Sequence, residues 1–143
     1  MVDYLFGKGV STALPKEGIR LVYSRKSGRV KLVYIENRLF ATVKPNGSMA
    51  ISMFGASILV RSKRFLENCI VVSDDVAEFV RGGRSVFCKF VKSAGRNIYP
   101  KSEVVILDGS GKVLGVGMAV MAGEFMTQFK SGAAAKVREG LRR

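Results

Sequence analysis

The chain of 143 residues is 48% hydrophobic and has 16 glycines, a composition that is typical of one compact domain or two small ones and excludes a disordered protein. Its 24 Lys and Arg residues against 11 Asp and Glu residues give a formal net charge of +13, which indicates a polyanionic partner, with a merely soluble basic surface as the alternative. The longest nearly uncharged apolar run, 113–123, is too short and too rich in glycine to span a bilayer.

The positive charge is concentrated in the first half of the chain, because residues 1–66 contain 12 basic and 3 acidic side chains, a net of +9. A helical turn or loop docked by its aromatic side chains is expected before residue 18, followed by a first strand over 19–23. The turn at 24–29 then places three cations close together on a flexible backbone: Arg25, Lys26 and Arg29. This cluster predicts either a solvated hairpin tip or a clamp for phosphate groups.

Three strands are predicted next, as an antiparallel meander over 30–35, 38–44 and 48–52. Alternation along the second of these strands puts Leu39 on the core face and Phe40, with the neighbouring cations, on the opposite face. Such a face could stack and neutralise RNA, but more often it only covers a sheet. A helix over 53–62 is expected to pack on the meander, before a domain boundary near 65–68. Three cations cluster at the end of this helix: Arg61, Lys63 and Arg64.

Residues 70–91 predict a strand, a helix, a glycine turn and a second strand. Ser73 is a favourable helix N-cap. The buried face of the helix is expected to be formed by three apolar residues at helical spacing: Val76, Phe79 and Val80. Residues 85–91 alternate at period two, which predicts a strand with Lys89 on one face and Cys88 on the other.

The turn between this helix and this strand has the sequence Arg81-Gly82-Gly83-Arg84. The two glycines can supply the left-handed residue that ends the helix. Two guanidinium groups beside a turn without Cβ atoms would let a phosphate or a ribose lie close against the backbone.

The rest of the chain predicts a loop over 92–101, a hairpin of strands over 103–107 and 113–121, a helix over 123–130, and a strand over 133–137. The helix is expected to bury three apolar residues: Phe125, Met126 and Phe129. Alternation in the last strand puts Lys136 and Arg138 on one face, and Arg142 and Arg143 extend the positive charge to the C-terminus.

Several blocks, in this order, resemble a PUA domain, the RNA-binding module named after pseudouridine synthases and archaeosine transglycosylases: FVRGGRSVFCKFV at 79–91, KSEVVIL at 101–107, VLGVGMAV at 113–120 and AKVR at 135–138. The first block is most similar to archaeal tRNA-guanine (archaeosine) transglycosylases. DYLFG at 3–7 and SRKSGR at 24–29 resemble the small domain that precedes PUA in that family.

The resemblance implies an α+β fold, with a small antiparallel α+β domain over 1–66 and a PUA-type β pseudo-barrel with two short helices over 67–143. In the PUA family RNA lies along the first helix, the glycine loop after it and the last strand. Carried over to this sequence, those elements hold seven residues: Arg81, Gly82, Gly83, Arg84, Lys89, Lys136 and Arg138.

Catalytic chemistry is not expected from this sequence. It has no histidine, which removes the commonest general base and metal ligand, and its acidic residues form no pair at a diagnostic spacing. Cys69 and Cys88 are expected to be small buried residues; a disulfide is the less favoured alternative. We therefore expect no catalytic residue, no metal and no cofactor. In the archaeosine transglycosylases that the sequence resembles, the catalytic aspartates and zinc ligands belong to a large barrel domain outside this region.

Two functions are favoured by these features, and a small-molecule enzyme is the least favoured alternative. The first is a non-catalytic protein that binds tRNA or another structured RNA and assists a separate tRNA-modifying catalytic subunit. The second is an assembly or protein-interaction subunit with secondary RNA contact, whose docking patch would be formed by three exposed apolar residues: Tyr4, Leu5 and Phe6. The N-terminus lacks the basic start and long apolar core of a signal peptide, so a cytoplasmic location without membrane contact is expected.

Overall fold

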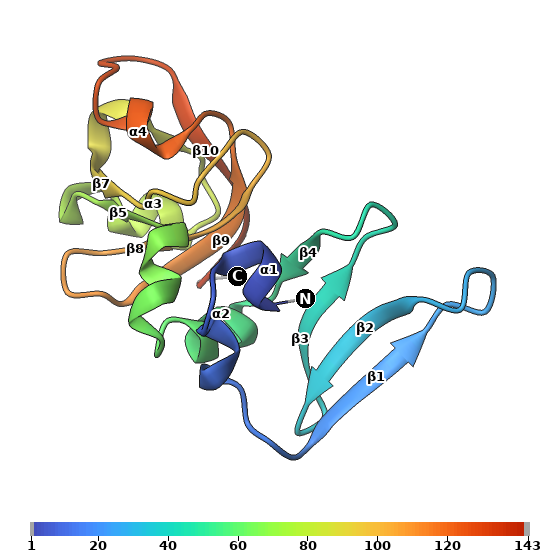
Figure 1. Ribbon diagram of the computed structural model, residues 1–143. Helices are drawn as coiled ribbons and strands as arrows, with labels where there is room; N and C mark the ends of the chain where they lie inside the picture. The colour runs from blue at the N-terminus through green and yellow to red at the C-terminus, as the bar shows by residue number, and fades with distance from the viewer. Residues whose placement is uncertain (1, 142–143) are drawn as a thin grey trace.

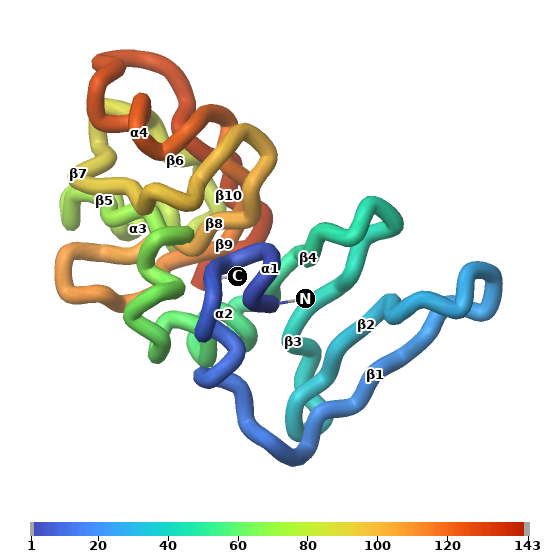
Figure 2. Tube along the Cα trace, viewed as in Figure 1, coloured from blue at the N-terminus to red at the C-terminus, as the bar shows by residue number. Residues whose placement is uncertain are grey.

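The computed structural model describes residues 2–141 and contains two β-sheets with short helical segments between and around them (Figure 1, Figure 2). The N-terminal sheet is an antiparallel meander of four strands in sequence order: β1 (Ile19–Tyr23), β2 (Val30–Ile35), β3 (Arg38–Val43) and β4 (Met49–Ile51). Its hairpin tips project away from the rest of the molecule (Figure 1). Three helical segments accompany it: α1 (Val2–Phe6), η1 (Val10–Ala13) and α2 (Met53–Leu59).

The second sheet curls into a near-barrel in the order β6-β10-β9-β8-β5-β7 (Figure 1). Its strands are β5 (Cys69–Val72), β6 (Val86–Phe87), β7 (Val91–Ala94), β8 (Glu103–Leu107), β9 (Val113–Ala119) and β10 (Ala133–Gly140). Its helical segments are η2 (Lys63–Asn68), η3 (Asp74–Val76), α3 (Ala77–Arg81), η4 (Cys88–Phe90) and α4 (Gly123–Met126). The β5–β8 pair is parallel and the other pairs of described strands are antiparallel. The expected α+β fold with a β pseudo-barrel is confirmed. The expectation for Arg142 and Arg143 lies outside the described residues.

A β-bulge in β3 overturns the predicted alternation of that strand. Tyr34 pairs with Leu39 and Val33 pairs with Ala41, so Phe40 between them has no partner of its own in β2. The extra residue shifts the side-chain alternation by one position. Phe40 is therefore fully buried, whereas Leu39 is on the exposed side. The prediction that Phe40 lies on an outer basic face was wrong.

The strand predicted over 85–91 is broken by a 3₁₀ turn. Residues Val86 and Phe87 form β6, η4 follows, and the chain resumes as β7, which continues through Ala94 into the predicted loop. The alternation of burial is nevertheless retained up to Lys89, since Val86 and Cys88 are buried and the residues between and after them are exposed. Because of this turn, one segment supplies both edge strands of the sheet: β6 pairs with β10 at one edge, and β7 pairs with β5 at the other.

The helices are shorter than predicted, and several of their phenylalanines are exposed. In α3 the buried residues are Ala77 and Val80, whereas Phe79 points to solvent. Helix α4 ends at Met126, which is fully buried, and leaves Phe125 and Phe129 exposed. The predicted burial of these three phenylalanines was wrong. No helix within residues 2–141 is long and apolar enough to cross a membrane.

The hydrophobic core consists of two clusters, and the second of them spans both sheets. One cluster fills the near-barrel, and a second joins residues of the meander and α2 to Val105, Leu107 and Val116 on strands β8 and β9. Phe6 is buried in this second cluster and meets Phe65 edge-on, with ring centroids 5.3 Å apart. Phe6 therefore belongs to the core and not to an exposed docking patch. A division of the chain into 1–66 and 67–143 stays a prediction, since the core is shared across it.

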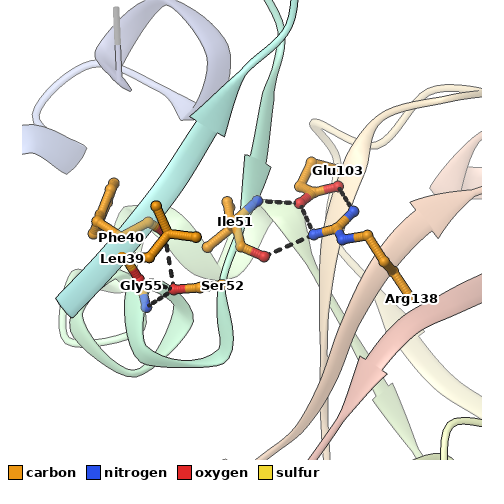
Figure 3. A network of polar contacts seen from close by, with 7 residues as sticks. All are labelled: Leu39, Phe40, Ile51, Ser52, Gly55, Glu103 and Arg138. Carbon is orange, nitrogen blue, oxygen red and sulfur yellow. Dashed lines mark hydrogen bonds and ion pairs between the residues drawn. The ribbon is translucent and has the colours of Figure 1, made fainter. Parts of the chain in front are cut away.

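A polar network connects the two sheets (Figure 3). Arg138 of β10 donates to Oε1 of Glu103 of β8 at 2.8 Å and to the carbonyl oxygen of Ile51 in β4 at 2.7 Å. The other carboxylate oxygen of Glu103, Oε2, accepts a hydrogen bond from the backbone N–H of Ile51. The next residue, Ser52, caps α2, because its Oγ accepts from the N–H of Gly55 at 2.9 Å. One carboxylate thus fixes the strand that leads into α2 against the near-barrel.

Candidate nucleic-acid interface

The glycine turn is built by the end of α3. Ser73 caps the preceding η3 as predicted, accepting from the N–H of Asp75. Gly82 continues with a helical backbone, and Gly83 takes the left-handed conformation, with φ of +91°. The N–H of Arg84 then donates to the Phe79 carbonyl at 2.9 Å, which closes the turn. This is the glycine-ended helix that the sequence predicts.

Arg81 at this turn is only partly available to a ligand. Its Nη1 lies 2.5 Å from Oε1 of Glu78, one helical turn earlier, and its side chain is 22% exposed. Its positive charge also acts on Asp108, whose pKa is held below its ordinary value chiefly by a hydrogen bond from Ser110 and only in small part by Arg81. Two guanidinium groups were expected to be available at the turn. Only that of Arg84 is, because Arg84 is exposed and makes no ion pair with the described residues.

An aromatic cavity of about 220 Å³ opens beside Arg84. Phe79 is 54% exposed and Phe87 is 48% exposed, and both line it together with Phe90. The guanidinium carbon of Arg84 lies 5.8 Å from the centre of the Phe79 ring, and Lys89 Nζ lies 4.9 Å from the centre of the Phe90 ring. Exposed rings beside cations can stack on a nucleobase while the cations neutralise a phosphate. We call this site the aromatic cavity.

The last strand runs beside the aromatic cavity, because β6 pairs with β10 and Val86 lies opposite Ala135. Lys136, the next residue, is exposed. Arg138 is already bound to Glu103 and Ile51, and its pKa is raised chiefly by the hydrogen bond to Glu103. The structure therefore brings Arg84, Lys89 and Lys136 to neighbouring elements, whereas the guanidinium of Arg138 takes part in an internal contact.

The N-terminal cations lie elsewhere. Arg25, Lys26 and Arg29 are exposed on the turn at the tip of the β1–β2 hairpin, which projects from the body of the molecule (Figure 1). Arg29 Nη1 makes a long contact of 3.5 Å with the Pro45 carbonyl. This contact links the tip to the adjacent β3–β4 turn, and the two alternatives for the cluster, solvated tip or phosphate clamp, stay predictions.

Both cysteines are small buried residues, as the sequence predicts. Both thiols are free and buried, and burial raises the pKa of Cys69 to about 12. A thiol with a raised pKa is a poor nucleophile at neutral pH. Within residues 2–141 no three His, Cys, Asp or Glu side chains are grouped so that they could hold a metal ion.

Residues 68–141 match the PUA domain, and residues 1–65 match the patch-forming domain C2 of tRNA-guanine transglycosylase. The chain therefore belongs to the PUA domain family. A hypothetical protein from the hyperthermophilic archaeon Pyrococcus horikoshii has the same fold, with a TM-score of 0.76 at 17% identity over 99% of this chain and 86% of that chain.

The curated relatives are archaeal tRNA-guanine(15) transglycosylases, as the resemblance predicts. The enzyme of Thermoplasma volcanium is 30% identical over 98% of this chain and 22% of its own length. That of Methanobrevibacter smithii is 32% identical over 100% of this chain and 22% of its own length. The chain thus spans about a fifth of the length of these relatives.

Proposed function

We propose that this protein is a non-catalytic RNA-binding protein that binds tRNA through the aromatic cavity and the cations around it. The observation that carries the proposal is the pair of exposed phenylalanines that line the aromatic cavity, Phe79 before the glycine turn and Phe87 after it, with Arg84 and Lys89 beside rings of the same cavity. The net charge of +13 and the relationship to tRNA-guanine(15) transglycosylases support a tRNA ligand.

Each residue has a distinct part in this binding. Arg84 and Lys136 contact phosphate groups, because both are exposed cations. The guanidinium group of Arg84 can also form bidentate hydrogen bonds with a phosphate. Phe79 and Phe87 stack on an unpaired base that enters the aromatic cavity. Gly83 leaves the turn open, since nothing lies within 4 Å of the position of a Cβ atom there. Arg81 orients the end of α3 through its ion pair with Glu78.

Two substitutions separate stacking from charge. Phe79→Leu keeps an apolar side chain but removes the ring, and we expect it to weaken tRNA binding by about 5- to 30-fold, the equivalent of about 1–2 kcal/mol of stacking. Arg84→Gln is expected to lower the slope of log affinity against log salt by about 0.7 to 0.9, as one lost phosphate contact requires. Titration of a labelled tRNA transcript over a KCl series measures both quantities.

Phe125→Leu is the matched control, because Phe125 is also an exposed phenylalanine but does not line the aromatic cavity. A second titration with tRNA that lacks its single-stranded 3′ end tests whether this end supplies the stacked base. Equal affinities for wild type and Phe79→Leu would remove stacking from the proposal, and binding by wild type that ignores salt would overturn the proposal as a whole.

A protein partner is the second part of the proposal. The β1 strand exposes Ile19, Leu21 and Tyr23, and a cavity of about 330 Å³ with mainly apolar lining lies on the same face of the meander. The net charge of +13 makes a second copy of the chain unfavourable, whereas an apolar surface with acidic neighbours would be complementary. We infer that the partner is a catalytic polypeptide corresponding to the part of the relatives that this chain does not match.

Leu21→Lys tests this docking face, because Leu21 is 41% exposed and the substitution places a charge among the exposed apolar residues. In sedimentation with the purified catalytic polypeptide we expect complex formation to be lost in Leu21→Lys and kept in Phe125→Leu. The partner assignment is wrong if wild type and Leu21→Lys form the complex equally well.

A further inference from the structure

A basic groove lies where three segments that are distant in sequence meet. It has a volume of about 550 Å³ and is lined by the residues that follow α1, by η2 and by the loop after β7. Its charged lining residues are four cations and one acid: Lys8, Lys63, Arg64, Arg96 and Glu67. We call this site the junction groove. It shares no lining residue with the aromatic cavity.

Two amide side chains, the buried Asn68 and the half-buried Asn97, link the three segments of the groove. Asn68, the one buried polar residue among the residues described, donates to the Phe6 carbonyl at 2.7 Å. Asn97 donates to Oδ1 of Asn68 at 2.7 Å and to the Leu5 carbonyl at 3.2 Å, and its backbone N–H donates to the Glu67 carbonyl at 2.9 Å. Satisfied buried networks of this kind make the surrounding backbone rigid. The groove is therefore formed before any ligand arrives.

The two arginines of the groove are held by one bond each. Nη1 of Arg64 donates to the Lys8 carbonyl at 2.7 Å, and Nε of Arg96 lies 2.8 Å from Oε2 of Glu67. The Arg96 side chain is nevertheless 91% exposed. The other N–H groups of both arginines make no hydrogen bond within residues 2–141. Both guanidinium groups are thus positioned but keep donors for a ligand.

We infer that the junction groove binds the phosphodiester backbone of RNA, as a second anchor besides the aromatic cavity. This inference rests on the proposed RNA-binding function and adds a second place of contact. Four cations against one acid suit a polyanion. An acidic protein partner fits less well, because protein interfaces depend on exposed apolar side chains and the ring that lines this groove, Phe6, is buried.

The test uses the full chain and a pair of substitutions that remove equal charge. Lys8→Gln/Lys63→Gln removes two exposed cations from the groove, and Lys16→Gln/Lys92→Gln removes two exposed cations that line neither site. If two phosphate contacts are lost, the slope of log affinity against log salt falls by about 1.4 to 1.8. Affinity for a labelled tRNA transcript at about 100 mM KCl then falls by about 20- to 60-fold.

We expect this loss in the groove variant and a change below about threefold in the control variant. Equal losses in the two variants would mean that only net charge matters, and an unchanged groove variant would leave the groove without RNA; either result overturns the inference. Arg84→Gln and Phe79→Leu in the same titration keep the two hypotheses apart. If they weaken binding while the groove variant does not, the junction groove fails and the proposed function stands.

Discussion

Replacement of Glu103 by alanine is expected to lower the free energy of unfolding by about 3 kcal/mol, because its carboxylate is the centre of the contact between the sheets. The Glu103 side chain is only 7% exposed, whereas that of Arg138 is 38% exposed. Removal of the carboxylate leaves the Arg138 guanidinium with the Ile51 carbonyl alone and deprives the Ile51 N–H of its acceptor (Figure 3). An unsatisfied buried donor costs about 1–3 kcal/mol, and a broken ion pair adds to that cost.

Urea denaturation followed by circular dichroism measures this loss. The double variant Glu103→Ala/Arg138→Met should lose less stability than the sum of the two single variants, with a coupling energy of about 1–2 kcal/mol. Glu124→Ala is the matched control, because Glu124 is exposed on α4 and takes part in no ion pair with the described residues. A loss below about 0.5 kcal/mol in Glu103→Ala would show that the network does not hold the sheets together.

The contact between Arg138 and Glu103 gives the two cations of the last strand, Lys136 and Arg138, different expected roles. Sequence alternation placed Lys136 and Arg138 on one face, and both are on the exposed side of β10. Their partners differ, however: Arg138 is bonded to the N-terminal sheet through Ile51, whereas Lys136 makes no ion pair within residues 2–141. We therefore expect Lys136 to contribute to RNA binding and Arg138 to contribute chiefly to the position of the near-barrel relative to the meander.

Local sequence patterns predicted most of the strands. The alternation of apolar residues, the turn residues and the helix caps each determine the structure of only a few neighbouring positions. The meander, the hairpin of β8 and β9, the Ser73 cap and the left-handed Gly83 all follow from such patterns. The bulge at Phe40 could not be predicted, since it depends on how β2 and β3 pair and on the packing of α2, where Gly55 lies against the Phe40 carbonyl. The pairing register depends on tertiary structure, and one extra residue in a strand moves the side chains that follow it to the opposite face of the sheet.

The residues of the two proposed binding sites were only partly predictable for a similar reason. Helical spacing identifies which residues share a face but not whether anything covers it, so Phe79 was assigned to the core although it lines the aromatic cavity. The cluster at Lys63 and Arg64 was visible in the sequence. Its union with Lys8 and Arg96 was not, because the junction groove forms only when three distant segments meet. The ion pair of Glu103 could not be predicted either, since its partner Arg138 lies 35 positions away in sequence.

Gly140→Ala is expected to destabilise the protein by about 2–3 kcal/mol, the upper part of the range for overpacking where backbone must move. A Cβ atom at this position would lie 2.2 Å from the carbonyl oxygen of Arg81 and 2.8 Å from that of Val80. Neither oxygen belongs to a flexible side chain, so β10 and the end of α3 would have to separate. Because α3 carries the glycine turn, this displacement should also weaken tRNA binding in the salt titration, together with the loss in the urea midpoint.

Gly82→Ala is the control on the other side of the same contact. Its backbone is helical, with φ of −79°, and an added Cβ atom would make ordinary contacts at 3.5 Å with the carbonyls of Glu78 and Phe79. Its stability should therefore change by less than about 0.5 kcal/mol, since alanine also restricts the unfolded chain. If Gly140→Ala unfolds at the same urea concentration as wild type, the end of β10 does not hold α3. The close approach of these two elements would then not be what positions the glycine turn beside the aromatic cavity.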